Sequence, residues 1–309
     1  MISTLRIFNS QAQFSVYLVL IVALLIITFP LSAAQRCVPE GQWLNPNDAS
    51  VLNDEQALQG FLKSPILLFG EHHQNAFHHQ WHLTWLQKLN EKIEHLEIAI
   101  EMLPKQSQPI IDQWMHDKLS DEEFIKKSDW NEYWQHDVNL YLPVLKYAKA
   151  QKIPIHAINV SKQLFKEVSR NGWKAIPIEQ REGLTDPGPA SRAYLKQLAR
   201  SFRRHALPSG EDISPEEGAR FRRFIDVQLL WDRAMAEGIA QARKQKHAPV
   251  IMAMMGSGHM MHQFGTPIQL DDMGHSDYTV IVPWDDHLHC DELKPGFADL
   301  VFGSPPNAR

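Results

Sequence analysis

The stretch Pro65-Ile-Leu-Leu-Phe-Gly-Glu-His-His73 decides the fold class of this chain. Its apolar run is short and lies between a proline and a glycine, which is typical of a strand that is buried on both faces. An acid and two histidines follow the glycine at once, and a helical pattern begins at His78. A buried strand that leads through a polar loop into a helix predicts an α/β sheet, in which ligands bind beyond the carboxyl ends of the strands.

Further apolar runs have the same character as Ile66 to Phe69 and predict four more buried strands. They are Ile98 to Ile100, Ile153 to Ile158, Val250 to Met255 and Tyr278 to Val282. Helical periodicity separates the earlier runs, with apolar residues on one face of residues 78–93 and 139–150. Strands that alternate with helices predict a mostly parallel sheet flanked by helices.

The segment from about residue 161 to 246 contains no convincing strand pattern and reads as helical. Helices are predicted at residues 162–171, 190–204 and 215–244, with loop compositions rich in proline and glycine between them. The sequence therefore predicts a helical subdomain inserted between the third and fourth strands. A ligand pocket is expected at the junction of sheet and insertion.

The charge of the chain argues against a nucleic-acid partner. Its 309 residues carry 36 acids and 31 basic residues, for a formal net charge of -5. A nucleic-acid footprint needs a basic face, and the notable basic cluster is Arg200 to Arg204 with Arg220 to Arg223. That cluster is either a solvated helix face or a site for anionic groups.

The N-terminus is predicted to be a secretory signal. An apolar run from Phe14 to Phe29 follows Arg6, and Ser32 and Ala34 supply the small residues of a cleavage site. Residues 1–34 would then be removed, leaving a domain at 35–302 and a disordered tail at 303–309. An uncleaved anchor is the alternative.

Export is expected to place the mature protein in the periplasm, where its two cysteines can oxidise. Cys37 and Cys290 then either form a disulfide or stay as two unpaired thiols. Cys37 follows Gln35-Arg36 rather than a small residue, so the sequence lacks an evident lipobox and attachment to a membrane is an open alternative.

Polar residues follow several of the predicted strands, and these strand ends meet at one edge of a parallel sheet. Glu71 and His73 follow the first strand, Glu101 the second, and Gly256-Ser-Gly-His259 the fourth. A carboxylate directly after an apolar strand is costly unless it is paired or bound to a cation. The set therefore predicts a functional site, with buried acids and core histidines as the structural alternative.

Two neighbouring features have weaker patterns. His78 and His82 are four residues apart on one helix face, which is metal-ligand spacing, but His78, His79 and His82 equally suit a polar helix start. Tyr141 begins the helix before the third strand. Tyrosine is one of the side chains that ligate haem iron, although a tyrosine in this setting is also a common packing residue.

From about Leu67 to Val282 the chain resembles the ChaN-like haem-binding uptake proteins of the Tiki superfamily. The matching blocks, in order, are Gly70-Glu-His-His-Gln-Asn with His78-His79, Glu101-Met102, Tyr141-x-Pro143, Asn159, Gln228-Leu-Leu-Trp-Asp-Arg-Ala-Met235, and Gly256-Ser-Gly-His259 with Gly265-x-Pro267. Each block alone is weak, and the ordered set is fairly specific.

The resemblance implies an exported protein that binds haem and serves bacterial iron uptake. It implies a homodimer around cofacial haems, an outer-membrane haem-uptake machinery as partner, and tyrosine or histidine on the iron, with Tyr141 as the tyrosine. Arg203 and Arg204 are the expected partners of the haem propionates. Arg203-Arg-His205 loosely resembles a histidine-containing loop of the family, so His205 is a further cofactor-binding candidate.

The same residues resemble a second class, the metal-dependent hydrolases of the Tiki superfamily. Those enzymes carry paired Gly-x-x-His motifs and a glutamate, which here are Gly70-x-x-His73, Gly256-x-x-His259 and Glu101. In that interpretation Glu71, His73 and His259 hold a divalent metal ion and Glu101 is the general base. A third interpretation is a non-enzymatic periplasmic scaffold that binds neither haem nor metal.

Overall fold

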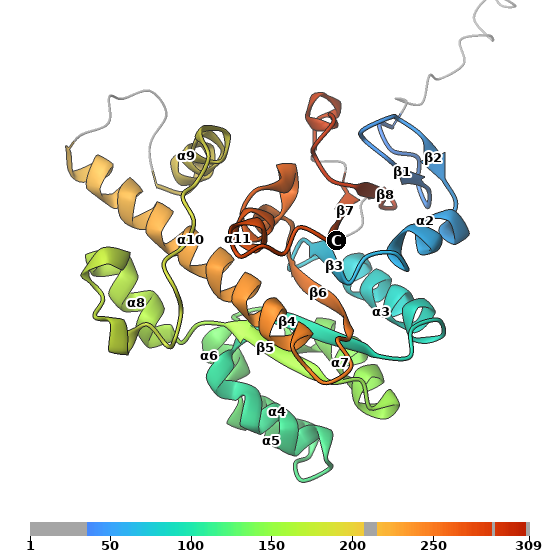
Figure 1. The fold of residues 1–309 in the computed structure, drawn as a ribbon, viewed down its shortest axis with the longest axis horizontal. Coiled ribbons are helices and arrows are strands. Elements are labelled where there is room, and N and C mark those ends of the chain that lie inside the picture. The colour runs from blue at the N-terminus through green and yellow to red at the C-terminus, as the bar shows by residue number, and fades with distance from the viewer. Residues whose placement is uncertain (1–35, 207–214, 286–287, 307–309) are drawn as a thin grey trace, which may run out of the picture. The chain divides into compact units, whose positions relative to one another are not determined.

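A mostly parallel sheet of eight strands lies at the centre of the unit Val38–Arg309 in the computed structural model (Figure 1). The spatial order is β2 (Val51–Leu52), β1 (Trp43–Leu44), β8 (Leu300–Gly303), β7 (Thr279–Trp284), β3 (Ile66–Glu71), β6 (Val250–Gly256), β4 (Leu96–Pro104) and β5 (Ile155–Asn159). Neighbours from β8 to β5 are parallel, whereas β1 is antiparallel to β2 and to β8. The predicted α/β class and its five buried strands are confirmed.

The structure describes residues 36–206, 215–285 and 288–306. The other unit of the chain, Met1–Cys37, contains the predicted signal peptide, so residues 1–34 lie outside the described part. Within the described ranges, every helix falls short of the length or the apolar character that a membrane span needs. Cys37 and Cys290 are both disulfide-bonded.

The three strands at one end of the sheet, β2, β1 and β8, were not predicted from the sequence, because β1 and β2 have two residues each and β8 has four. The expected disordered tail differs from the structure at its first residues. Gly303 exchanges backbone hydrogen bonds with Gly41 and Gln42, and Ser304 is fully buried. A Cβ on Gly303 would meet the carbonyl oxygen of Pro39 at 2.0 Å, so this pairing requires glycine. Residues 307–309 lie outside the described part.

One face of the sheet is covered by helices that come before β5 in the chain. They are α2 (Asp54–Phe61), α3 (Ala76–Asn90), α4 (Gln108–Met115), α5 (Asp121–Lys127), α6 (Trp130–Tyr133) and α7 (Val138–Gln151). Leu67 and Phe69 of β3 share one buried cluster with Trp85 of α3 and Leu145 of α7. Because side chains alternate along a strand, the neighbouring residues of β3 face the other side.

The other face is crossed by the long helix α10 (Pro215–Arg243), which lies along β4, β5 and β6 (Figure 1). Between β5 and β6 the described chain also forms α8 (Lys162–Asn171) and α9 (Arg192–Ala206), and α11 (Thr266–Asp272) follows β6. Residues from α8 and α10 form a separate hydrophobic cluster that includes Leu164, Val168 and Leu230. The helices of the predicted insertion are thus present at 162–171, 192–206 and 215–243.

Gly238 sets how closely α10 approaches the sheet. A Cβ at this position would lie 2.5 Å from Cγ2 and 2.6 Å from Cβ of Ile158 on β5. Real Cβ atoms do not approach other atoms this closely, so helix and strand are in contact through the bare backbone of Gly238. This contact fixes the distance between α10 and the carboxyl edge of the sheet.

We predict that Gly238→Ala destabilises the protein by about 1–3 kcal/mol, because an added methyl group overpacks the contact with Ile158. Gly218→Ala is the matched control on the same helix, since its added Cβ would meet only Nη1 of Arg222 at 3.7 Å. The control is expected to be stabilising by up to about 1 kcal/mol through helix propensity. Urea unfolding of both variants checks the prediction, and equal effects would contradict it.

Candidate functional site

The predicted strand ends meet at the carboxyl edge of the sheet. Glu71 is the last residue of β3 and is in register with Gly256, the last residue of β6. Oε2 of Glu101 on β4 accepts a hydrogen bond from the Gly256 backbone N–H at 2.7 Å, and Asn159 Nδ2 donates to the Glu101 carbonyl at 2.9 Å. The structure therefore brings Glu71, Glu101 and the Gly256 turn together, as the sequence pattern predicts.

The carboxylate of Glu71 is fully buried at the centre of this edge. Its Oε1 accepts a hydrogen bond from the Tyr141 hydroxyl at 2.9 Å and is 2.8 Å from Nδ1 of His73. Burial by itself raises the pKa of Glu71, but the hydrogen bond from His73 and the charges that the surrounding imidazoles carry at acid pH outweigh it and lower the pKa to about 2. An ionised carboxylate thus lies inside the protein.

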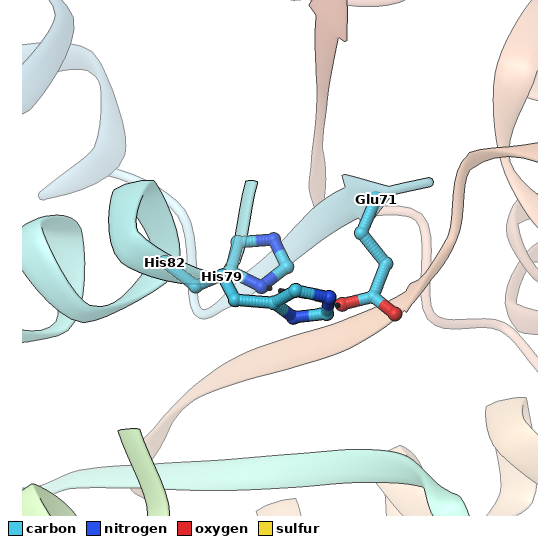
Figure 2. Close-up of side chains that lie close together, drawn as sticks. All are labelled: Glu71, His79 and His82. Atoms are coloured by element: carbon cyan, nitrogen blue, oxygen red, sulfur yellow. Dashed lines mark ion pairs between the residues drawn. The ribbon is translucent and has the colours of Figure 1, made fainter. Parts of the chain in front are cut away.

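The other oxygen of Glu71, Oε2, faces two imidazoles from α3 (Figure 2). It lies 3.4 Å from Nδ1 of His79 and 3.5 Å from Nδ1 of His82. Asn75 caps α3 by accepting from the backbone N–H of Phe77, so the helix starts directly after the loop and both rings project from its first turns toward β3. Burial lowers the pKa of His82 to about 4.

His78 belongs to a different set of contacts, although it is on the same helix. Its Nδ1 accepts a hydrogen bond from the backbone N–H of His72 at 2.9 Å, and its Nε2 is 3.0 Å from Asp285. The histidines of α3 that meet at Glu71 are therefore His79 and His82, three residues apart, and not the pair His78 and His82 suggested by the spacing.

His73 reaches out of this buried cluster toward solvent, with 30% of its side chain exposed. Its ring packs edge-on against Trp134 at 4.7 Å and lies 5.1 Å from the ring of His136. A Cβ on Gly256 would lie 2.9 Å from Nε2 of His73, so the glycine of the second Gly-x-x-His motif makes room for the histidine of the first.

His259 follows β6 and is held by a buried carboxylate that the sequence analysis missed. Its Nδ1 lies 2.7 Å from Oδ1 of Asp232 on α10, and Asp232 also accepts a hydrogen bond from the Tyr194 hydroxyl. Nε2 of His259 lies 3.7 Å from Oε1 of Glu101. Burial lowers the pKa of His259, but the hydrogen bond to Asp232 and the charge of Glu101 outweigh it and raise the pKa to about 9.

Two cavities open at this edge of the sheet, each a little over 300 Å³ in volume. The first, of about 320 Å³, lies between the sheet and α8 and is lined by His73, Glu101, Trp134, His136, Lys162, Phe165, Trp231 and His259, among others. The second, of about 330 Å³, is bounded by β7 and the Gly256 turn and shares His73 and His136 with the first. His136 is a second residue that the sequence analysis did not name, although it follows an aromatic-rich stretch.

A third cavity, of about 410 Å³, lies between α8, α9 and α10. Its walls are Phe165, Phe202, Phe224, Val227 and Trp231, with Ser169, Arg220, Arg223 and Gln228 completing the lining. Phe165 and Trp231 also line the first cavity, and their rings are stacked at 5.3 Å. The first and third cavities are therefore neighbours on either side of one aromatic pair.

The remaining predicted residues are Tyr141 on α7 and three residues of α9. Tyr141 is 1% exposed, and burial beside the charge of Glu71 raises the pKa of its hydroxyl above the usual value. Arg203 is exposed on α9. Arg204 and His205 also belong to α9, but their side chains lie outside the described part of the structure.

The fold and site define an α/β protein with polar side chains and cavities at the carboxyl edge of a parallel sheet. Residues 57–270 match the family described as haem-binding uptake, Tiki superfamily, ChaN. This chain belongs to that family, and the resemblance drawn from its sequence blocks is confirmed.

Solved structures add a likeness of fold. The structure of ChaN of Campylobacter jejuni with cofacial haem is similar over 84% of this chain and 95% of its own, with a TM-score of 0.67 and 18% identity. Two further structures are more distant. The type III effector HopBA1 has a TM-score of 0.47 and 12% identity over 88% of this chain and 100% of its own, and an erythromycin esterase mutant has a TM-score of 0.46 and 13% identity over 78% of this chain and 76% of its own. No curated protein matches the chain.

We predict that Asp232→Asn lowers the pKa of His259 from its value of about 9. Loss of a buried opposite charge within hydrogen-bond distance shifts a pKa by about 1–3. Asp226→Asn is the matched control, because Asp226 lies on the same helix and accepts from the Trp173 backbone N–H instead. Titration of the histidine side chains by NMR checks both variants. A pKa of His259 that is unchanged in Asp232→Asn would refute this account of the pair.

Proposed function

We propose that this chain is an exported haem-binding protein that serves bacterial haem or iron uptake. Membership of the ChaN family supports haem as the ligand. The single observation in the structure that carries the proposal is the adjoining pair of cavities at Phe165 and Trp231, with imidazoles on one side and arginines on the other.

The chemistry of these two cavities fits haem, which has a large flat apolar ring, an iron that binds nitrogen or oxygen donors, and two carboxylates. Trp134, Phe165 and Trp231 supply aromatic surface. Imidazoles are available as iron ligands from His73 and His136 at the sheet edge. Across the aromatic pair, Arg223 and Arg220 supply positive charge for propionates, a pairing that arginine forms with particular strength.

His136 is the imidazole best suited to bind the iron. It lines both cavities at the sheet edge, and burial lowers its pKa, so that the ring is neutral and has a free nitrogen near neutral pH. Tyr141 remains the ligand suggested by the family resemblance. Its ring would first have to leave the interior and give up the hydrogen bond to Glu71, so the geometry favours histidine.

Further contacts to haem and the export of the protein are also part of the proposal. Arg203, Arg204 and His205 on α9 stay candidates for contacts to haem, as the resemblance implies. Export is supported by the apolar leader before Ala34 and by the disulfide-bonded cysteines, which suit the periplasm. N-terminal sequencing of the periplasmic protein tests cleavage after Ala34.

Pairing of two chains around haem is proposed from the similar structure of Campylobacter jejuni ChaN, whose haems are cofacial. Haem delivered by an outer-membrane uptake machinery belongs to the same proposal. Light scattering during haemin addition tests pairing: the mass of the particle is expected to double. A mass that stays constant while haemin binds would count against the homodimer.

A metal-dependent hydrolase is the second candidate. The observation in its favour is the Asp232–His259 pair beside Glu101 on the wall of the first cavity, since an imidazole oriented by a carboxylate is a common general acid or base. This candidate uses Glu71, His73 and His259 as metal ligands and Glu101 as the base. It requires that His259→Ala releases a bound metal ion.

We predict that the purified chain binds haemin and that His136→Ala shifts the Soret band and weakens binding by at least about tenfold, because an iron ligand is removed. Tyr141→Phe is expected to leave the Soret band in place, since the hydroxyl is engaged with Glu71. Spectrophotometric titration with haemin measures both. His116→Ala, an exposed histidine at the end of α4, is the control and should bind as the wild type does.

The reverse pattern, a shifted Soret band in Tyr141→Phe and none in His136→Ala, would make tyrosine the ligand and overturn the choice of His136. A wild-type chain that does not bind haemin would overturn the haem proposal itself. Circular dichroism of each variant shows whether the fold is retained.

A further inference from the structure

A cluster of one carboxylate and two imidazoles lies behind the cavities, in the interior of the protein. Glu71 is 2%, His79 3% and His82 1% exposed, and they converge from the end of β3 and the first turns of α3 (Figure 2). Each side chain offers one possible ligand atom, a carboxylate oxygen of Glu71 and a ring nitrogen of each histidine, and these three atoms lie within 4.8 Å of one another.

The backbone determines which nitrogen of each imidazole carries the proton. Nε2 of His79 lies 3.0 Å from the carbonyl oxygen of His73, and Nε2 of His82 lies 3.0 Å from the carbonyl oxygen of Gly70. A carbonyl oxygen only accepts hydrogen bonds, so each Nε2 must be the donor. In a neutral imidazole the other nitrogen, Nδ1, then has a lone pair and no proton.

Three acceptors consequently point at one another. The Nδ1 atoms of His79 and His82 lie 3.4 and 3.5 Å from Glu71 Oε2, beyond the usual length of a hydrogen bond. Oε2 is buried and has no hydrogen-bond partner among the described residues. An unsatisfied buried carboxylate oxygen is costly, and two facing lone pairs add repulsion. A cation between the three atoms removes both costs.

We propose that Glu71 Oε2, His79 Nδ1 and His82 Nδ1 bind a divalent transition-metal ion. Two imidazoles and one carboxylate form a donor set that suits Zn²⁺ or Fe²⁺. Ligand atoms about 2.0–2.1 Å from a tetrahedral ion lie about 3.3 Å apart. The distances of 3.4 and 3.5 Å from Oε2 to the two Nδ1 atoms are close to that spacing.

The neighbours of the cluster complete the pattern of a metal site. Metal-bound histidines commonly donate their second ring N–H to a backbone carbonyl, as His79 and His82 do here. The second oxygen of the carboxylate is held by Tyr141 and His73, which fixes the direction of Oε2. An ion bound here links β3 to α3 and, through His73, fixes one wall of the haem crevice.

This ligand set differs from the one that the paired Gly-x-x-His motifs suggest. His73 and His259 have their Nδ1 atoms on Glu71 Oε1 and Asp232, respectively. The inference does not rest on haem binding, so either can fail alone. The competing occupant of the cluster is a proton on one Nδ1 atom, which would make that ring an imidazolium.

The test uses the full chain, without an affinity tag and free of haem. It is treated with a chelator and titrated with Co²⁺, whose visible absorption reports tetrahedral nitrogen and oxygen ligands, and then with Zn²⁺ in competition. We predict one high-affinity ion per chain. His79→Gln and His82→Gln should each weaken binding by at least about 100-fold, because a direct ligand counts for more than an outer-shell partner.

His78→Gln and His259→Ala are the matched controls and should keep the ion. His78 is an equally buried histidine of the same helix that faces Asp285, and His259 is a ligand only in the hydrolase interpretation. If the wild-type chain takes up no ion, the cluster holds a proton on one Nδ1 atom instead, and the proposal is overturned. Loss of the ion in His259→Ala with retention in His79→Gln would also overturn it. The wild-type titration decides the question even if a variant fails to fold.

Discussion

The buried carboxylate of Glu71 is the constraint on which the carboxyl edge of this protein depends. An ionised group inside a protein is stable only when its surroundings supply donors or cations. Here Tyr141 and His73 hold one oxygen, and the two imidazoles of α3 surround the other. The inward direction of the Tyr141 hydroxyl and the direction of His73 are both tied to this one carboxylate.

The long helix α10 places a second buried carboxylate, Asp232, against the same edge. It can do so because the bare backbone at Gly238 lets the helix lie directly on Ile158 of β5. Asp232 then reaches His259, and Trp231, one residue earlier, separates the two cavities proposed for haem. One helix therefore covers the sheet, orients an imidazole and shapes the cavities.

Much of the fold was predictable because buried parallel strands appear in the sequence as continuous apolar runs. Four of the five long strands lie within two residues of their predicted bounds, as do the helices at 162–171 and 215–243, whereas β4 extends well beyond the predicted residues 98–100. The short strands β1, β2 and β8 carry too few residues for a pattern, and β1 joins the sheet by pairing with β8, which is distant in sequence. For the same reason Gly303 read as the start of a tail, when its pairing with the segment after Val38 makes it part of the sheet.

The sequence by itself determined the five long strands of the sheet, the edge at which polar residues collect and the family to which the chain belongs. These depend on local order: an apolar run, a glycine and the acid or histidine that follows it. Only the tertiary structure decided the partners. His79 and His82, rather than His78, meet Glu71. His259 is held by Asp232 of α10, and the Tyr141 hydroxyl is turned inward to Glu71. The physical reason is that side-chain direction depends on helix phase and on the distance between α10 and the sheet, which involve contacts between residues far apart in the chain.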